Sequence, residues 1–64
     1  MKVYFYIKQE ELEYLNNIIK DYNTLEEPLQ ISFNPMIGAC MVSLSIDDFI
    51  GLSDREAFAT LISL

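Results

Sequence analysis

Two neighbouring carboxylates, Asp47 and Asp48, form a pair of side chains that could do chemistry. Paired carboxylates can bind Mg²⁺ or Ca²⁺, but this pair lacks the alternating oxygen ligands of a calcium-binding loop. The pair also directly follows a run of alternating apolar residues, at a junction where an aspartate often caps the first turn of a helix. We therefore interpret the pair as a helix cap and expect no metal site.

Nucleophilic and cofactor chemistry have few candidates in this chain. Cys40 is the one cysteine among 64 residues, and there is no histidine to activate it. The alternation around Cys40 directs its side chain inward, where a free cysteine behaves as a small hydrophobe. The two glycines do not form a phosphate-binding loop, and no nucleophile motif is present. The sequence thus predicts no catalytic residue and no cofactor.

The charge of the chain limits its partners. Ten carboxylates face four lysines and arginines, which gives a formal net charge of −6. Nucleic-acid phosphates and anionic membrane surfaces are bound by clustered basic side chains, and this chain has no such cluster. No apolar stretch approaches the length of a membrane span. We therefore expect neither direct nucleic-acid binding nor membrane association.

The length of the chain bears on its assembly. A domain of this size buries only about 60% of its unfolded surface and is usually supported by disulfides, a metal or oligomerisation. One cysteine cannot form an internal disulfide. We therefore expect one domain over residues 1–64 that forms a homo-oligomer or binds a partner.

Three segments alternate between apolar and polar residues, the pattern of half-buried strands. They cover residues 2–8, 29–34 and about 39–46. The last two are joined by Asn34-Pro35-Met36-Ile37-Gly38, residues suited to a tight reversal. These two strands should form a hairpin with a loop of four or five residues.

Two other segments repeat apolar residues every three or four positions, which is typical of amphipathic helices. The first lies between Gln9 and Asn23. The second runs from Asp54 to about Ser63, and the residues 53–56 at its start match a capping box. Gly51 argues against a long unbroken helix before it.

The order strand, helix, strand, strand, helix predicts an α+β fold with a three-stranded sheet. The first helix should pack on one face, whose expected apolar residues are Val3, Phe5, Ile7, Leu29, Ile31, Phe33, Val42 and Leu44. The C-terminal helix could cover part of the other face, or it could pack on a second copy. Both arrangements remain open at this point.

Tyr4, Tyr6 and Met41 fall on the strand faces opposite the expected core. Tyrosine and methionine are enriched in the cores of protein interfaces, so these residues are candidates for a contact surface. The alternative is that the C-terminal helix covers them.

Glu10, Glu13 and Asp21 fall on the polar face of the first predicted helix. These carboxylates could imitate a phosphate array and occupy the nucleic-acid site of another protein. The alternative is a solvated face that keeps the chain soluble.

In size, acidity and lack of catalytic groups, the chain resembles the small accessory proteins with which bacteriophages block host enzymes or defence systems. This resemblance implies a non-enzymatic viral inhibitor that binds a bacterial protein. The lone Cys40 within an apolar run suits a reducing cytoplasm, which is where we expect the chain to act. Two alternatives stay open. The chain could sequester a nucleotide between subunits, using Lys2, Lys8, Lys20 and Arg55, or it could be an antitoxin-like structural module.

Overall fold

The computed structural model describes residues 1–22 and 25–63 and confirms the predicted α+β class. Its elements are β1 (Lys2–Lys8), a 3₁₀ turn η1 (Gln9–Glu11), α1 (Leu12–Asp21), β2 (Gln30–Asn34), β3 (Ala39–Ser45), α2 (Ile46–Ser53) and α3 (Glu56–Ile62). The predicted end of the first helix at Asn23 lies outside the described residues. Compared with the predicted order, an additional helix, α2, separates β3 from the C-terminal helix.

The three strands form an antiparallel sheet in the order β1-β3-β2, so β3 is the central strand. Val42 of β3 lies opposite Phe5 of β1 on one side and Ile31 of β2 on the other. Because β3 has a neighbour along both edges, it is the most buried of the strands.

A four-residue loop joins β2 to β3, as the sequence predicts. The Asn34 side chain accepts a hydrogen bond from the Met36 amide at 3.0 Å, and the Asn34 carbonyl accepts one from the Gly38 amide at 2.9 Å. Gly38 has a φ of +66°, a left-handed conformation that a glycine adopts without steric cost. This turn chemistry sets the register of the hairpin.

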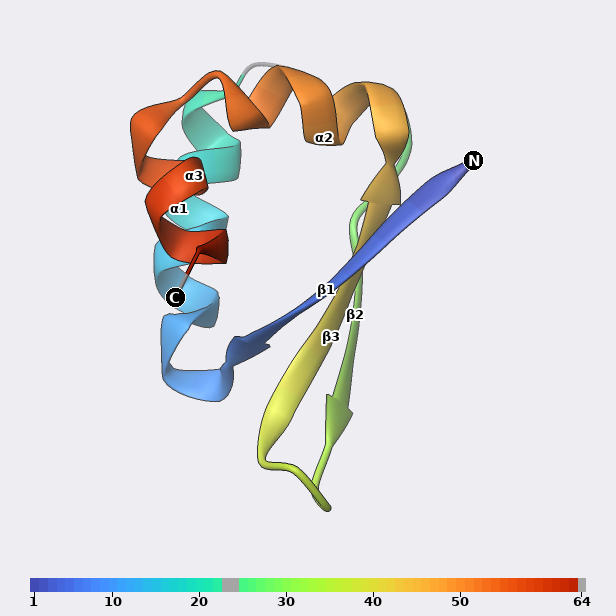
Figure 1. Cartoon of the computed structure of the whole chain (residues 1–64), viewed down its shortest axis with the longest axis vertical. Coiled ribbons are helices and arrows are strands. Elements are labelled where there is room, and N and C mark those ends of the chain that lie inside the picture. The colour runs from blue at the N-terminus through green and yellow to red at the C-terminus, as the bar shows by residue number, and fades with distance from the viewer. Residues whose placement is uncertain (23–24, 64) are drawn as a thin grey trace.

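Within residues 1–22 and 25–63, the α-helices α1, α2 and α3 all lie on one face of the sheet, and none of them covers the other face (Figure 1). α3 contacts α1, α2 and β1, and α2 also contacts β3. The core between this helix layer and the sheet consists of Ile7, Leu15, Ile18, Cys40, Val42, Leu44, Leu52, Phe58 and Leu61. At its centre, the ring of Phe58 meets the rings of Phe5 and Phe49 edge-on, each at 5.7 Å between centroids.

The helix layer covers less of the sheet than the sequence indicates. Ile31 and Phe33 point to the helix side, as expected, but 40% and 48% of their surfaces remain exposed. The expectation that both belong to the core is therefore wrong. The helices pack over β1 and β3, and β2 extends beyond them as an uncovered edge.

Both predicted helix caps also differ from the structure. Ser45, rather than Asp47 or Asp48, caps α2, and its hydroxyl accepts a hydrogen bond from the Asp48 amide at 3.1 Å. α2 then continues through Gly51 to Ser53, whose hydroxyl donates to the Phe49 carbonyl. Ser53 therefore belongs to the last turn of α2, and α3 begins at Glu56 without a capping box.

Candidate functional site

The sheet face that carries no helix holds three of the candidate residues (Figure 1). Tyr6 of β1 lies directly opposite Met41 of β3, and Tyr4 lies opposite Ser43. The two tyrosines are 60% and 57% exposed, whereas Met41 is half-buried between its neighbours. We call this surface, formed by Tyr4, Tyr6, Met41, Ser43, Gln30 and Ser32, the open face.

α3 does not cover the open face, because it packs beside α1 on the opposite side of the sheet. Of the two arrangements considered for the C-terminal helix, the one that hides the tyrosines is therefore absent in this chain. Tyr4 and Tyr6 remain accessible to another molecule.

A shallow hollow of about 310 Å³ crosses the open face. It is lined by Tyr4, Met41 and Ser43, together with the β2 residues Gln30, Ile31 and Ser32. Ser43 forms part of its lining and is 4% exposed, and its hydroxyl finds no hydrogen-bond partner among the described residues.

The electrostatic character of the open face differs from that of the rest of the chain. All ten carboxylates of the sequence lie outside the three strands. The alternating residues of the open face are tyrosine, methionine, serine and glutamine, with Lys2 at the start of β1. This surface offers apolar contact and neutral hydrogen bonding.

The acidic candidates lie away from the open face. Glu10 is in η1, Glu13 and Asp21 are in α1, and all three side chains are exposed. The structure thus separates the six candidate residues into an acidic group in the helix layer and an apolar group on the sheet.

Asp48 is a buried carboxylate that sequence reasoning assigned only to capping. It is 3% exposed, and its oxygens accept hydrogen bonds from the Glu26 amide at 2.9 and 3.0 Å and from the Glu27 amide at 3.3 Å. Burial by itself would raise the pKa of Asp48, but these amides and a hydrogen bond with Ser45 hold the pKa below its usual value of 3.8. Asp48 therefore ties residues 26–27 to the start of α2.

The remaining chemical candidates are structural. Cys40 is 1% exposed and packs in the core. Within residues 1–22 and 25–63, no group of three or more acidic, cysteine or histidine side chains is placed to hold a metal ion. In the same part of the chain, no helix has the length and apolar character needed to cross a bilayer.

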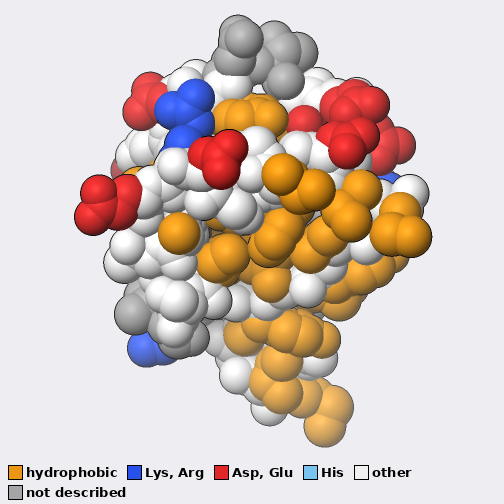
Figure 2. All heavy atoms as spheres, turned by 45° about the horizontal axis from the view of Figure 1, so that its top comes forward, with side chains coloured by type: hydrophobic (Ala, Val, Ile, Leu, Met, Phe, Trp, Pro, Cys, Tyr) orange, Lys and Arg blue, Asp and Glu red, His pale blue; other side chains and the backbone are white. Residues whose placement is uncertain are grey.

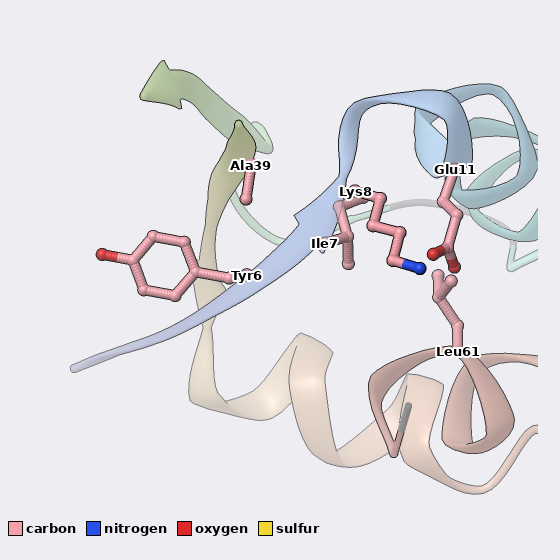
Figure 3. A pocket seen from close by; sticks show the side chains of 6 residues that line it. All are labelled: Tyr6, Ile7, Lys8, Glu11, Ala39 and Leu61. Carbon is pink, nitrogen blue, oxygen red and sulfur yellow. The ribbon is translucent and has the colours of Figure 1, made fainter. Parts of the chain in front are cut away.

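A second hollow, of about 260 Å³, opens where β1 ends (Figure 3). Its lining residues are Tyr6, Ile7, Lys8, Glu11, Ala39 and Leu61. Figure 3 shows the ends of the Lys8 and Glu11 side chains pointing toward one another above Leu61, while Tyr6 points away. The Glu11 carboxylate places a negative charge in the lining of this hollow, which disfavours a bound phosphate.

Sequence reasoning missed the apolar surface along β2. Besides Ile31 and Phe33, the hairpin loop exposes Met36 and Ile37, which are 92% and 58% accessible. Figure 2 shows hydrophobic side chains gathered in a broad band on one side of the molecule, with acidic side chains along its upper rim. The one signal available in the sequence was the absence of any charged residue from 29 to 46.

Comparison of the chain with protein-family models, curated proteins and solved structures found no match in any of the three.

Proposed function

We propose that this chain is a small, non-enzymatic interaction protein that acts in the bacterial cytoplasm as a homo-oligomer. In this proposal it binds and blocks a bacterial enzyme or defence protein, as do the phage inhibitors it resembles in size and charge. The observation that carries the proposal is the open face, where Tyr4 and Tyr6 are more than half exposed and no helix covers them.

Several properties of the open face support its use as a contact surface. Tyrosine and methionine are enriched in interface cores, and a few desolvated aromatic side chains usually supply most of the binding energy. Tyr6 and Met41 adjoin across the strands, so they offer one continuous apolar area. The polar side chains of Gln30 and Ser32 can supply hydrogen bonds at its margin.

The acidic side chains have a separate role in the proposal. Glu10, Glu13 and Asp21 are exposed on the helix layer, where a basic partner surface would be attracted to them. If the partner is a nucleic-acid-binding enzyme, these carboxylates stand in for phosphates. If they only solvate the helix layer, the open face alone supplies the contact.

The experiment compares two tyrosines that have similar exposure and lie in different elements, Tyr6 in β1 and Tyr14 in α1. Tagged chains carrying Tyr6→Lys or Tyr14→Lys are used to capture proteins from a bacterial lysate, and the captured proteins are identified by mass spectrometry. Tyr14 lies in α1 and is 50% exposed, so Tyr14→Lys makes the same chemical change away from the open face. We expect a stoichiometric partner that Tyr14→Lys retains and Tyr6→Lys loses.

Retention of the partner by both variants would show that the open face is not the binding surface. Circular dichroism of each variant establishes that the fold persists, because a lost partner is informative only for a folded chain.

Nucleotide sequestration is the alternative function, and the positions of the cations argue against it within one copy. Lys2 and Lys8 lie at opposite ends of β1, and the Arg55 guanidinium lies over the Tyr22 ring at 5.4 Å from its centroid. A bound nucleotide in the purified protein, detected by mass spectrometry after denaturation, would favour this alternative over protein binding.

A further inference from the structure

β2 is an edge strand that lacks the usual features that prevent pairing with a strand of another chain. Exposed strand edges commonly carry lysine, proline or another device that prevents pairing with a second chain. The other edge strand, β1, begins with Lys2 and ends with Lys8. β2 consists of Gln-Ile-Ser-Phe-Asn, has no charge, and is exposed at all five positions.

The helix side of β2 is apolar as well as uncovered. Ile31 and Phe33 point to the side on which the helices lie, but the helix layer stops at β3 and leaves both half-exposed. A strand edge beside two exposed apolar side chains offers hydrogen bonds and hydrophobic contact to the same incoming strand.

We propose that β2 pairs with β2 of a second copy, in antiparallel orientation, to form a continuous six-stranded sheet. The symmetry of such a pair restricts its geometry. A two-fold axis perpendicular to the sheet makes the strands antiparallel and keeps both helix layers on the same side. Residues that face each other must then point to the same side of the sheet.

Only one register pairs all five residues of β2 with all five of the second copy. It is centred on Ser32, which faces Ser32 of the second copy, and it places Ile31 opposite Phe33 and Gln30 opposite Asn34. A shift of two residues would bring Pro28 or Pro35 into the ladder, and proline cannot donate a ladder hydrogen bond. The register therefore matches apolar with apolar and amide with amide.

Charge does not prevent a second copy, whose β2 is self-complementary in this register, from occupying this edge. Two chains of net charge −6 repel one another, but no carboxylate lies in any strand. Contact along β2 joins the copies while their acidic residues stay outside the paired strands. The open face also remains free, so pairing along β2 and partner binding do not compete.

This inference deepens the homo-oligomer part of the proposed function by naming its interface, and a charge-swap experiment tests it. Ser32→Lys and Ser32→Asp each place like charges opposite one another, which disfavours pairing. We expect sedimentation velocity at micromolar concentration to show a several-fold weaker dimer for either variant alone. A one-to-one mixture of the two should recover dimerisation, whereas Ser63→Lys, an exposed control outside the sheet, should dimerise like the unaltered chain.

Cross-linking supplies a second measurement that depends on the register. Ser32→Cys places two thiols opposite one another at the two-fold axis and should give a disulfide-linked dimer under mild oxidation. In Gln30→Cys the two thiols are offset by four residues, roughly 13 Å along the strands, which exceeds disulfide reach. The native Cys40 is buried and does not interfere.

A chain that stays monomeric throughout the micromolar range would overturn the inference. So would equal cross-linking of the two cysteine variants, or a charge-swap mixture that fails to recover. Loss of the dimer in Tyr6→Lys, with the Ser32 variants unaffected, would move the interface to the open face. Retention of the captured partner by Tyr6→Lys, with an intact dimer, would count against the proposed binding surface alone.

Discussion

The phenol of Tyr22 occupies the space in which a side chain at Gly51 would have to lie. A Cβ built on Gly51 would overlap the Tyr22 hydroxyl and would come within 3.0 Å of the ring carbon that bears it. Gly51 lies inside α2, where a glycine is usually unfavourable. A residue without a side chain is needed at this position because Tyr22, the residue that follows α1, packs directly against it. The same ring carries the Arg55 guanidinium on its face.

This contact predicts that Gly51→Ala destabilises the chain. In most helix interiors alanine is favoured over glycine by roughly 0.5–1 kcal/mol. Here we expect a loss of about 1–3 kcal/mol, the usual cost of overpacking, measured by urea unfolding. In a Tyr22→Phe background the loss should shrink, because the closest atom is gone. A stabilising Gly51→Ala in the unaltered chain would contradict the packing described here.

Two serines of β3 should respond in opposite directions to replacement by alanine. Ser43→Ala removes a buried hydroxyl that has no partner among the described residues, so stability should be unchanged or higher. Ser45→Ala removes the cap of α2 and should cost about 0.5–2 kcal/mol. Thermal unfolding of the two variants under the same conditions compares them directly, and equal losses would refute the assignment of the cap.

Asp48 predicts how the chain responds to acid. The pKa of Asp48 in the folded chain lies below 3.8, the usual value that it has in the unfolded chain. The ionised carboxylate therefore stabilises the fold fully at pH values above 3.8. This stabilisation is lost as the pH falls through the lower pKa of the folded chain. Asp48→Asn should cost about 1.5–3 kcal/mol at neutral pH, since hydrogen bonds to a charged acceptor are replaced by weaker ones. The variant should also lose part of the acid sensitivity below about pH 4.

Asp47→Asn is the matched control for Asp48, because Asp47 is exposed in the same helical turn. Its cost should stay under about 1 kcal/mol, the range of helix-dipole effects. Urea unfolding curves recorded from pH 3 to pH 7 would separate the two aspartates.

Two phenylalanines on the helix side of the sheet should differ in their contribution to stability. Phe58 is fully buried between Phe5 and Phe49, and Phe58→Ala should cost about 3–5 kcal/mol. Phe33 is 48% exposed, so Phe33→Ala should cost less than half as much in the monomer. The measurement belongs at submicromolar concentration, where pairing along β2 does not contribute. Equal costs would mean that β2 is covered within one copy.

Reversal of Glu10, Glu13 and Asp21 to lysine distinguishes phosphate imitation from simple solvation. In an electrostatic mimic, association with the partner should slow by tenfold or more and lose its dependence on salt. For a solvated helix face, the association rate should be nearly unchanged. Stopped-flow or surface plasmon measurements at two salt concentrations, made with the partner from the capture experiment, decide between the cases.

Local patterns in the sequence predicted much of this fold. The alternation of Val3, Phe5 and Ile7 with Tyr4 and Tyr6 correctly placed the two tyrosines on the face away from the core, because side chains on a strand alternate between its two sides. The hairpin was predictable because Asn34 and Gly38 carry their turn chemistry with them.

The coverage of β2 could not be predicted in the same way. Alternation correctly indicates that Ile31 and Phe33 point to the helix side, but it contains no information on whether a helix reaches them. Coverage depends on where α1 and α3 settle, which is set by contacts between residues distant in sequence.

The cap of α2 illustrates the same limitation. Ser45, Asp47 and Asp48 are all residue types that cap helices, so the sequence offers three candidates within four positions. The choice is made where the β1–β3 ladder ends, with Lys2 opposite Ser45. α2 begins at the next residue, Ile46, and the Asp48 carboxylate accepts hydrogen bonds from the amides of residues 26 and 27.

Because the strands contain no carboxylate, the negative charge of the molecule is distributed unevenly between the helix layer and the sheet. A cationic partner in solution is drawn to the helix layer, whereas a neutral or acidic surface meets least repulsion at the sheet. A protein that docks on Tyr4 and Tyr6 should therefore present a patch poor in lysine and arginine. A partner with a strongly basic active site should instead bind at Glu10 and Glu13. The charge of the captured partner therefore indicates which side of this small protein it binds.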